Sequence, residues 1–116
     1  MKIVIFIITL FVVFPALAGH KCSEKYYQNN LCYGVTEYRL DDRTRVDCLT
    51  RNYAIEFDFA PKWAEAIGQS LHYAKKTGKK PAIYLIVENE KQWHYVELIR
   101  ELCIDLGITL WVIKGY

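Results

Sequence analysis

The sequence predicts an α/β domain built on a mixed sheet. Three short runs that alternate apolar and polar residues, 35–40, 45–50 and 53–59, follow one another with short turns and predict a β-meander. Two helical patterns then alternate with continuous apolar runs at 82–87 and 108–113, which are typical of strands buried on both faces. The order β-β-β-α-β-α-β therefore predicts a three-stranded meander extended by two crossover units, with helices packed against the sheet.

The N-terminus has the pattern of a secretory signal peptide. Lys2 precedes an apolar run over 3–14, and the small-residue site Ala16-Leu17-Ala18 follows it. The run is shorter than the ~20 residues of a bilayer-spanning helix, although an uncleaved anchor is the alternative. We expect residues 1–18 to be removed and the protein to be exported, periplasmic or secreted, without stable membrane association after cleavage.

The charge balance excludes a strongly basic protein. Loss of Lys2 takes the 15 Lys and Arg residues to 14, against 13 Asp and Glu residues, which is a net charge of +1. Such a balance predicts neither strong nonspecific binding to nucleic acid nor a polybasic membrane contact.

The cysteines suggest a disulfide in the segment 19–34, ahead of the α/β domain expected over 35–116. Cys22 and Cys32 flank a polar, tyrosine-rich stretch, and in an oxidising compartment we expect them to pair, which adds ~2–3 kcal/mol of stability. Cys48 and Cys103 lie on apolar faces and are expected to be small buried residues, with a bridge between them as the alternative.

The second and third strands are expected to form a hairpin around the loop Arg51-Asn52. A loop of two residues fixes the register, because it places Cys48 opposite Ile55 and Asp47 opposite Glu56. Two carboxylates that face each other across a ladder destabilise the hairpin by some tenths of a kcal/mol. A bound divalent cation would offset this repulsion.

Two neighbouring residues bear on the acidic pair. Arg45 falls opposite Asp58 in the same register, so the alternative is a solvated face on which the arginine softens the repulsion. A loop of residues 41–43 between the first two strands would place Glu37 opposite Asp47 and extend the acidic face across a third strand, whereas a loop of four would not.

The first long helix is expected to begin at Pro61 and to end at Gly78. Its apolar arc consists of Trp63, Ala64, Ile67, Leu71 and Ala74. A polar stripe lies nearly opposite this arc and consists of Lys62, Glu65, Gln69 and Tyr73. Periodicity alone therefore favours a solvated face for the stripe.

The second helix is expected over 90–106, between a cap at Asn89 and a stop at Gly107. Its inward residues are expected to be Tyr95, Val96, Ile99, Leu102, Cys103 and Leu106.

The acidic strand residues and the polar helical stripe together resemble the PD-(D/E)XK, or restriction-endonuclease-like, nuclease superfamily. The resemblance rests on Asp47, then Glu56 on the next strand, then a helix with Gln69-x-x-x-Tyr73, which is similar to the RecB-type branch. It covers residues 37–87, and the order β-β-β-α-β agrees with the superfamily's core. It implies that Asp47 and Glu56 bind Mg²⁺ or Mn²⁺, and that Gln69 and Tyr73 orient the substrate or a water molecule.

The sequence departs from the superfamily at the third motif position. Asp58 occupies the position of the lysine in the E-x-K motif, and Lys62 is expected to supply the cation from the helix. Alternatively, Asp58 is a third metal ligand, or the site has lost catalysis. Glu37 and Glu65 are expected on the substrate side of the same site.

The implied function is an exported, metal-dependent nuclease that hydrolyses phosphodiester bonds of DNA or RNA. The catalytic set would be Asp47, Glu56, Asp58, Lys62 and Gln69. The alternative is a secreted binding domain that kept the fold and lost turnover.

Overall fold

A computed structural model describes residues 19–116 of the chain, so the expected signal peptide at 1–18 lies outside the described residues. The elements follow in the order α1 (Glu24–Leu31), β1 (Val35–Arg39), β2 (Arg45–Leu49), β3 (Tyr53–Phe59), α2 (Trp63–Thr77), β4 (Lys80–Val87), α3 (Trp93–Leu106) and β5 (Thr109–Lys114). Single 3-10 turns, Ala60–Lys62 and Glu90–Gln92, lead into α2 and α3.

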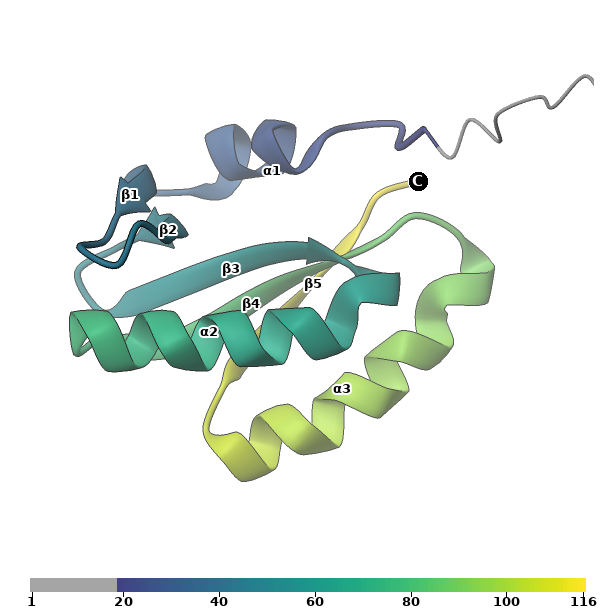
Figure 1. Cartoon of the computed structure of the whole chain (residues 1–116). Helices are drawn as coiled ribbons and strands as arrows, with labels where there is room; N and C mark the ends of the chain where they lie inside the picture. The colour runs from purple at the N-terminus through teal and green to yellow at the C-terminus, as the bar shows by residue number, and fades with distance from the viewer. Residues whose placement is uncertain (1–18) are drawn as a thin grey trace, which may run out of the picture.

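The five strands form one mixed sheet in the order β1-β2-β3-β4-β5. The first three strands are antiparallel, and β3, β4 and β5 are parallel. Both crossovers run in the same direction across the sheet, and right-handed crossovers therefore place α2 and α3 on one face, while α1 lies on the other side (Figure 1). The predicted α/β meander followed by two crossover units is confirmed.

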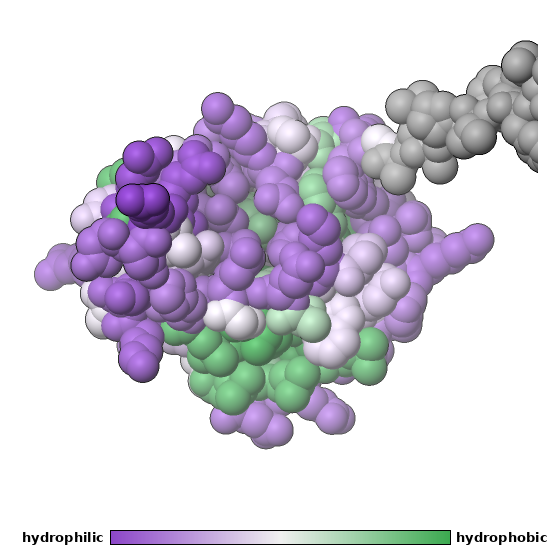
Figure 2. Space-filling view, in the orientation of Figure 1, coloured by the Kyte–Doolittle hydropathy of each residue, from purple (hydrophilic) through white to green (hydrophobic). Residues whose placement is uncertain are grey.

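Each face of the sheet has its own apolar core. On the face covered by α2 and α3, Ile83 and Leu85 of β4 pack against Val96, Ile99 and Cys103 of α3. On the opposite face, Tyr27 of α1 covers a second cluster that includes Phe57, Phe59, Cys48 and Ile86. Hydrophobic residues are also visible on the outer surface over α3, whereas the face around α1 and the start of α2 is mostly hydrophilic (Figure 2).

The disulfide joins Cys32 to Cys48, with the two Cα atoms 5.8 Å apart, so the predicted Cys22–Cys32 pairing is wrong. Helix α1 stands between Cys22 and Cys32, and eight helical residues span about 12 Å, beyond the ~7 Å limit for a disulfide. The alternative Cys48–Cys103 bridge is also excluded, because Cys48 is bonded to Cys32 and Cys103 is a free thiol on the buried side of α3.

Three further expectations are corrected by the structure. Helix α1 was not in the predicted element order; Ser23 caps it by accepting a hydrogen bond of 3.1 Å from the Tyr26 backbone N–H. Strand β5 is an edge strand and not a fully buried one, so Val112 is exposed. Leu102 and Leu106 were expected to face inward on α3 but lie at its exposed margin.

Two backbone positions need the freedom of glycine. Gly78 ends α2 in the left-handed conformation at φ 69°, as expected for the C-cap. At Gly34 a Cβ atom would lie 2.0 Å from the Leu49 carbonyl oxygen, so only glycine lets the chain enter β1 this close to β2. Among residues 19–116, no helix is long and apolar enough to cross a membrane.

Candidate functional site: an acidic cleft beside strand β3

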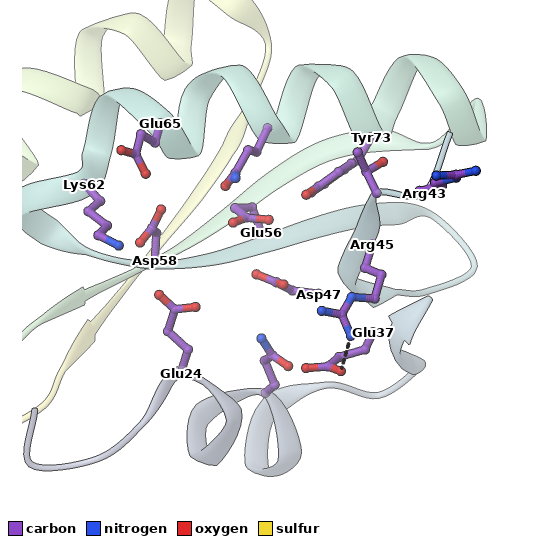
Figure 3. A pocket seen from close by; sticks show the side chains of 13 residues that line it. Glu24, Glu37, Arg43, Arg45, Asp47, Glu56, Asp58, Lys62, Glu65 and Tyr73 are labelled. Atoms are coloured by element: carbon purple, nitrogen blue, oxygen red, sulfur yellow. Dashed lines mark hydrogen bonds and ion pairs between the residues drawn. The ribbon is translucent and has the colours of Figure 1, made fainter. Parts of the chain in front are cut away.

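A cleft of about 480 Å³ lies between α1 and α2, along the side of β3 that faces β2 (Figure 3). Its lining is strongly polar. The residues that line it are Glu24, Gln28, Glu37, Arg43, Thr44, Arg45, Asp47, Glu56, Asp58, Lys62, Glu65, Gln69 and Tyr73. The cleft thus brings together every residue that the sequence nominated for the catalytic, metal-binding and substrate-binding sets.

The cleft exists because β2 and β3 pair over only part of their length. The predicted register is confirmed where Cys48 faces Ile55 and where the Thr50 N–H bonds to the Tyr53 carbonyl at 2.9 Å. The ladder ends at Cys48 and Ile55. The predicted ladder pair of Asp47 and Glu56 is therefore absent. On the side that faces β2, the second half of β3 therefore borders the cleft, while its other edge stays paired with β4.

Two carboxylates replace the missing strand at this edge. The Phe57 backbone N–H donates to Asp47 Oδ2 at 2.8 Å, and the Phe59 N–H donates to Asp58 Oδ1 at 3.0 Å. An open strand edge presents backbone donors that need acceptors. Asp47 and Asp58 satisfy these donors and are thereby held facing the cleft.

Half-buried Asp47 and buried Glu56 form the centre of the cleft. Glu56 is 5% exposed, and its Oε2 atom has no hydrogen-bond partner among residues 19–116. Burial raises the pKa of Glu56 far above its usual range, and the charge of Asp47 raises it further. Burial also raises the pKa of Asp47, against the opposing effect of the hydrogen bond from Phe57. At neutral pH the pair therefore retains a proton unless a cation takes its place.

Asp58 forms a second acidic position beside this pair. It is 4% exposed, and burial together with the charge of Glu24 raises its pKa. The cationic side chain of Lys62 extends from the start of α2 toward Asp58 and acts in the opposite direction (Figure 3). Lys62 thus approaches the acidic centre from the helix, as the sequence predicted.

Helix α1 supplies two residues that the sequence analysis did not nominate, Glu24 and Gln28. Glu24 lies in the first turn of α1 and points across the cleft toward Asp58 (Figure 3). Gln28 is 4% exposed, and its Oε1 atom has no hydrogen-bond partner in the described part of the chain. Ser23 followed by Glu24 was the available signal for a helix start, but nothing local placed that helix against β3.

The polar stripe of α2 lines the cleft, where Lys62, Glu65 and Gln69 are exposed as expected for a solvated face, whereas Tyr73 is buried. Tyr73 is only 7% exposed, and the pKa of its hydroxyl is raised to about 12 by burial and by the nearby carboxylates. The small residues Ala66 and Ser70 of the same helix are fully buried. The stripe and the apolar arc lie on either side of these two positions, and both are near other elements.

Arginines stand at one end of the cleft. Arg45 pairs with Glu37 at 3.4 Å and not with Asp58, which corrects the predicted apposition. The register of β1 and β2 places Glu37 opposite Asp47 as predicted, between the pairs Thr36–Cys48 and Tyr38–Val46. Glu37 itself adopts φ 50° and is not among the ladder pairs. Arg43 has φ 71° at the end of the three-residue loop, which is confirmed by the Leu40 N–H bond to the Thr44 carbonyl at 2.8 Å.

The loop that carries Arg43 is tied to α2. His72 Nε2 lies 2.6 Å from Asp42 Oδ2, and the Thr44 backbone N–H donates to Asp42 Oδ1 at 2.9 Å. Hydrogen bonds from Thr44, with a smaller effect of His72, lower the pKa of Asp42 to about 2. No role for His72 was predictable from neighbouring residues, because its partner lies 30 residues away in the chain.

The donor set defines what the cleft accommodates. Six carboxylic residues and three cationic ones line it, and one of the cations, Arg45, is engaged by Glu37. Within residues 19–116, no three Asp, Glu, His or Cys side chains are grouped so as to hold a metal ion. The adjacent pair Asp47 and Glu56 fits a cation that takes one or two carboxylates and fills its other positions with water or substrate oxygens, as Mg²⁺ does.

No protein-family model, curated protein sequence or solved structure matches this chain.

Proposed function

We propose that this chain is an exported, metal-dependent nuclease that hydrolyses phosphodiester bonds of DNA or RNA in the acidic cleft. The observation that carries the proposal is the pair of half-buried Asp47 and buried Glu56, in which Glu56 Oε2 has no partner among the described residues. A buried, unpaired carboxyl group costs several kcal/mol unless a cation or proton neutralises it. The resemblance of Asp47, Glu56 and Gln69-x-x-x-Tyr73 to the PD-(D/E)XK superfamily supports the same assignment.

A bound Mg²⁺ or Mn²⁺ would neutralise the scissile phosphate and lower the pKa of the attacking water. Asp47 and Glu56 would hold this cation, and the hydrogen bond from Phe57 fixes Asp47 in place for that task. The burial of Glu56 lowers the effective dielectric constant around it, which strengthens its interaction with a cation.

The other residues of the cleft have roles that follow from their positions. Lys62 lies beside Asp58 and would donate to a phosphate oxygen as negative charge develops there (Figure 3). Gln69 and Tyr73 line the α2 side and would orient the substrate or the attacking water, with Glu65 on the same side. Arg43 stands at the other end, where it would contact a flanking phosphate.

The extracytoplasmic location is supported by two features. The Cys32–Cys48 disulfide is typical of oxidising compartments, and residues 1–18 have the pattern of a signal peptide. The proposal is therefore that the cleft acts on nucleic acid outside the cytoplasm.

The test is metal-dependent cleavage by the oxidised mature domain of four substrates: single- and double-stranded DNA and RNA. We expect cleavage with Mg²⁺ or Mn²⁺, none with EDTA, and none by the Asp47→Asn variant. Asp105→Asn is the matched control, because Asp105 is exposed on α3 and does not line the cleft. Equal cleavage by the wild type and the Asp47→Asn variant would show a contaminating nuclease and contradict the assignment.

The second candidate is a secreted binding domain without turnover. It is favoured by Asp58, a buried acid at the position where the superfamily has lysine. A cleft with this excess of carboxylates binds cations whether or not it cuts a phosphodiester. Metal that stabilises the domain while no substrate is cut under any condition would favour this candidate.

A further inference from the structure

Gln28 is a polar side chain in an energetically costly position. It is 4% exposed, it lines the acidic cleft from α1, and its Oε1 atom has no hydrogen-bond partner among residues 19–116. A buried polar group without a partner costs about 1–3 kcal/mol of stability. A leucine of similar size would fill the same space on α1 without that cost.

The chemistry of the unpartnered atoms indicates which kind of ligand would satisfy them. The two such atoms in the cleft, Gln28 Oε1 and Glu56 Oε2, are both oxygens and therefore hydrogen-bond acceptors or cation ligands. A bare phosphate oxygen satisfies neither of them. A hydrated cation satisfies both, because it binds a carboxylate directly and its waters donate hydrogen bonds.

We propose that Gln28 is a ligand-binding residue of the Asp47–Glu56 site, and that its amide oxygen accepts a hydrogen bond from a water molecule of the hydrated cation bound there. This inference rests on the proposed function, and it adds α1 to the walls that recognise the cation. Gln28 acts through hydrogen bonding to the cation's water shell, whereas Asp47 and Glu56 contact the cation itself.

The experiment compares the wild type with the Gln28→Leu, Gln28→Glu and Asn29→Leu variants of the oxidised mature domain. Thermal melts and calorimetric titrations are recorded with Mn²⁺ or Mg²⁺ alone, without substrate. Asn29 is exposed on the same helix and does not line the cleft, so Asn29→Leu controls for the helix propensity of leucine.

Without metal, the Gln28→Leu variant should melt above both the wild type and the Asn29→Leu variant, because a buried unpartnered group is removed. With Mn²⁺, the Gln28→Leu variant should bind at least tenfold more weakly than the wild type, as is typical when a partner of the hydration shell is lost. The Gln28→Glu variant keeps an acceptor oxygen and should retain the response to metal.

Each contrary outcome has a distinct meaning. A Gln28→Leu variant that melts below the wild type without metal would show a structural role and overturn the inference. Unchanged Mn²⁺ affinity in the Gln28→Leu variant, with a normal response in the wild type, would overturn the inference and leave the nuclease proposal standing. A wild type that responds to neither metal would remove the proposed metal site and this inference together.

Discussion

The backbone N–H of Phe57 donates a hydrogen bond of 2.8 Å to the carboxylate of Asp47, at the point where the ladder between β2 and β3 stops. A strand edge is normally satisfied by another strand, and here a side chain replaces the backbone acceptor. Asp47 is therefore both a structural cap for β3 and a wall of the acidic cleft. These two roles are separable by substitution.

Asp47→Asn and Asp47→Ala should separate the two roles. Asparagine keeps an oxygen that accepts from the Phe57 N–H and removes one charge next to Glu56, so stability without metal should be unchanged or higher. Alanine leaves the Phe57 N–H without its acceptor and should cost about 1–2 kcal/mol in denaturant unfolding. Both variants should lose the stabilisation by Mg²⁺ or Mn²⁺. A loss of several kcal/mol in the Asp47→Asn variant would mean that the carboxylate is purely structural.

Stability without metal should fall as the pH rises. The folded-state pKa of Glu56 is raised above its unfolded value, so the folded state binds more protons than the unfolded state. The stabilisation is complete below about pH 4 and is lost progressively through neutral pH, at ~1.4 kcal/mol per pH unit for each excess proton. Glu56→Gln should flatten this slope in unfolding curves recorded from pH 4 to 8. Glu97→Gln, at an exposed position of α3, should leave it intact; equal slopes for all three proteins would contradict the buried proton.

Lys62→Ala should separate metal binding from turnover. Lys62 is exposed at the start of α2, and in the proposed function it contacts the phosphate and not the metal, so its removal should leave the melting shift with Mg²⁺ in place. The rate of cleavage should fall, because the positive charge beside the reacting phosphate is lost. Lys75→Ala, at an exposed position near the end of the same helix, serves as the control. Loss of the metal response in the Lys62→Ala variant would place the lysine in the metal site instead.

Gln69→Ala should reduce turnover at least tenfold, which corresponds to about 1.4 kcal/mol in the activation barrier. Stability should change little, because Gln69 is exposed and its side chain is in none of the hydrogen bonds found among residues 19–116. The measurement is kcat with saturating metal, alongside a melt of each protein. A change below twofold would leave Gln69 as a solvated residue of the stripe.

The cysteine pattern is testable by mass spectrometry. Non-reducing peptide mapping should find Cys32 joined to Cys48, with Cys22 and Cys103 free. Cys22 should react with a thiol reagent in the folded protein, whereas Cys103, 2% exposed, should react only after unfolding. Replacement of Cys32 and Cys48 by serine should cost about 3 kcal/mol for a closed loop of this length. Recovery of a Cys22–Cys32 peptide would contradict the arrangement of α1.

Local rules were sufficient for the meander and its registers. The loop Arg51-Asn52 fixes the pairing of Cys48 with Ile55, and alternation then places Glu56 and Asp58 on one face of β3. The apolar run of β4 and the cap at Asn89 are equally local signals. For this reason the fold class and the acidic centre were both predictable.

The remaining features depend on contacts between distant segments. The ladder between β2 and β3 ends at Cys48, and no residue of the hairpin indicates this end in the sequence. The position of α1, and with it Gln28, depends on Tyr27 packing against β3 across the sheet. Periodicity placed the buried side of α2 along its large apolar residues, whereas the buried residues of this helix are the small Ala66 and Ser70 together with Tyr73 of the polar stripe.

The disulfide joins two elements that form walls of the cleft, helix α1 and strand β2. Cys32 ends α1, and Cys48 is adjacent to Asp47 on β2, so the bond fastens the wall that carries Gln28 to the strand that carries the central acid. In a newly synthesised chain whose thiols are still reduced, these two walls are held by packing alone. Reduction of the disulfide should therefore loosen the contact between these two walls, and with it the position of Gln28 relative to Asp47.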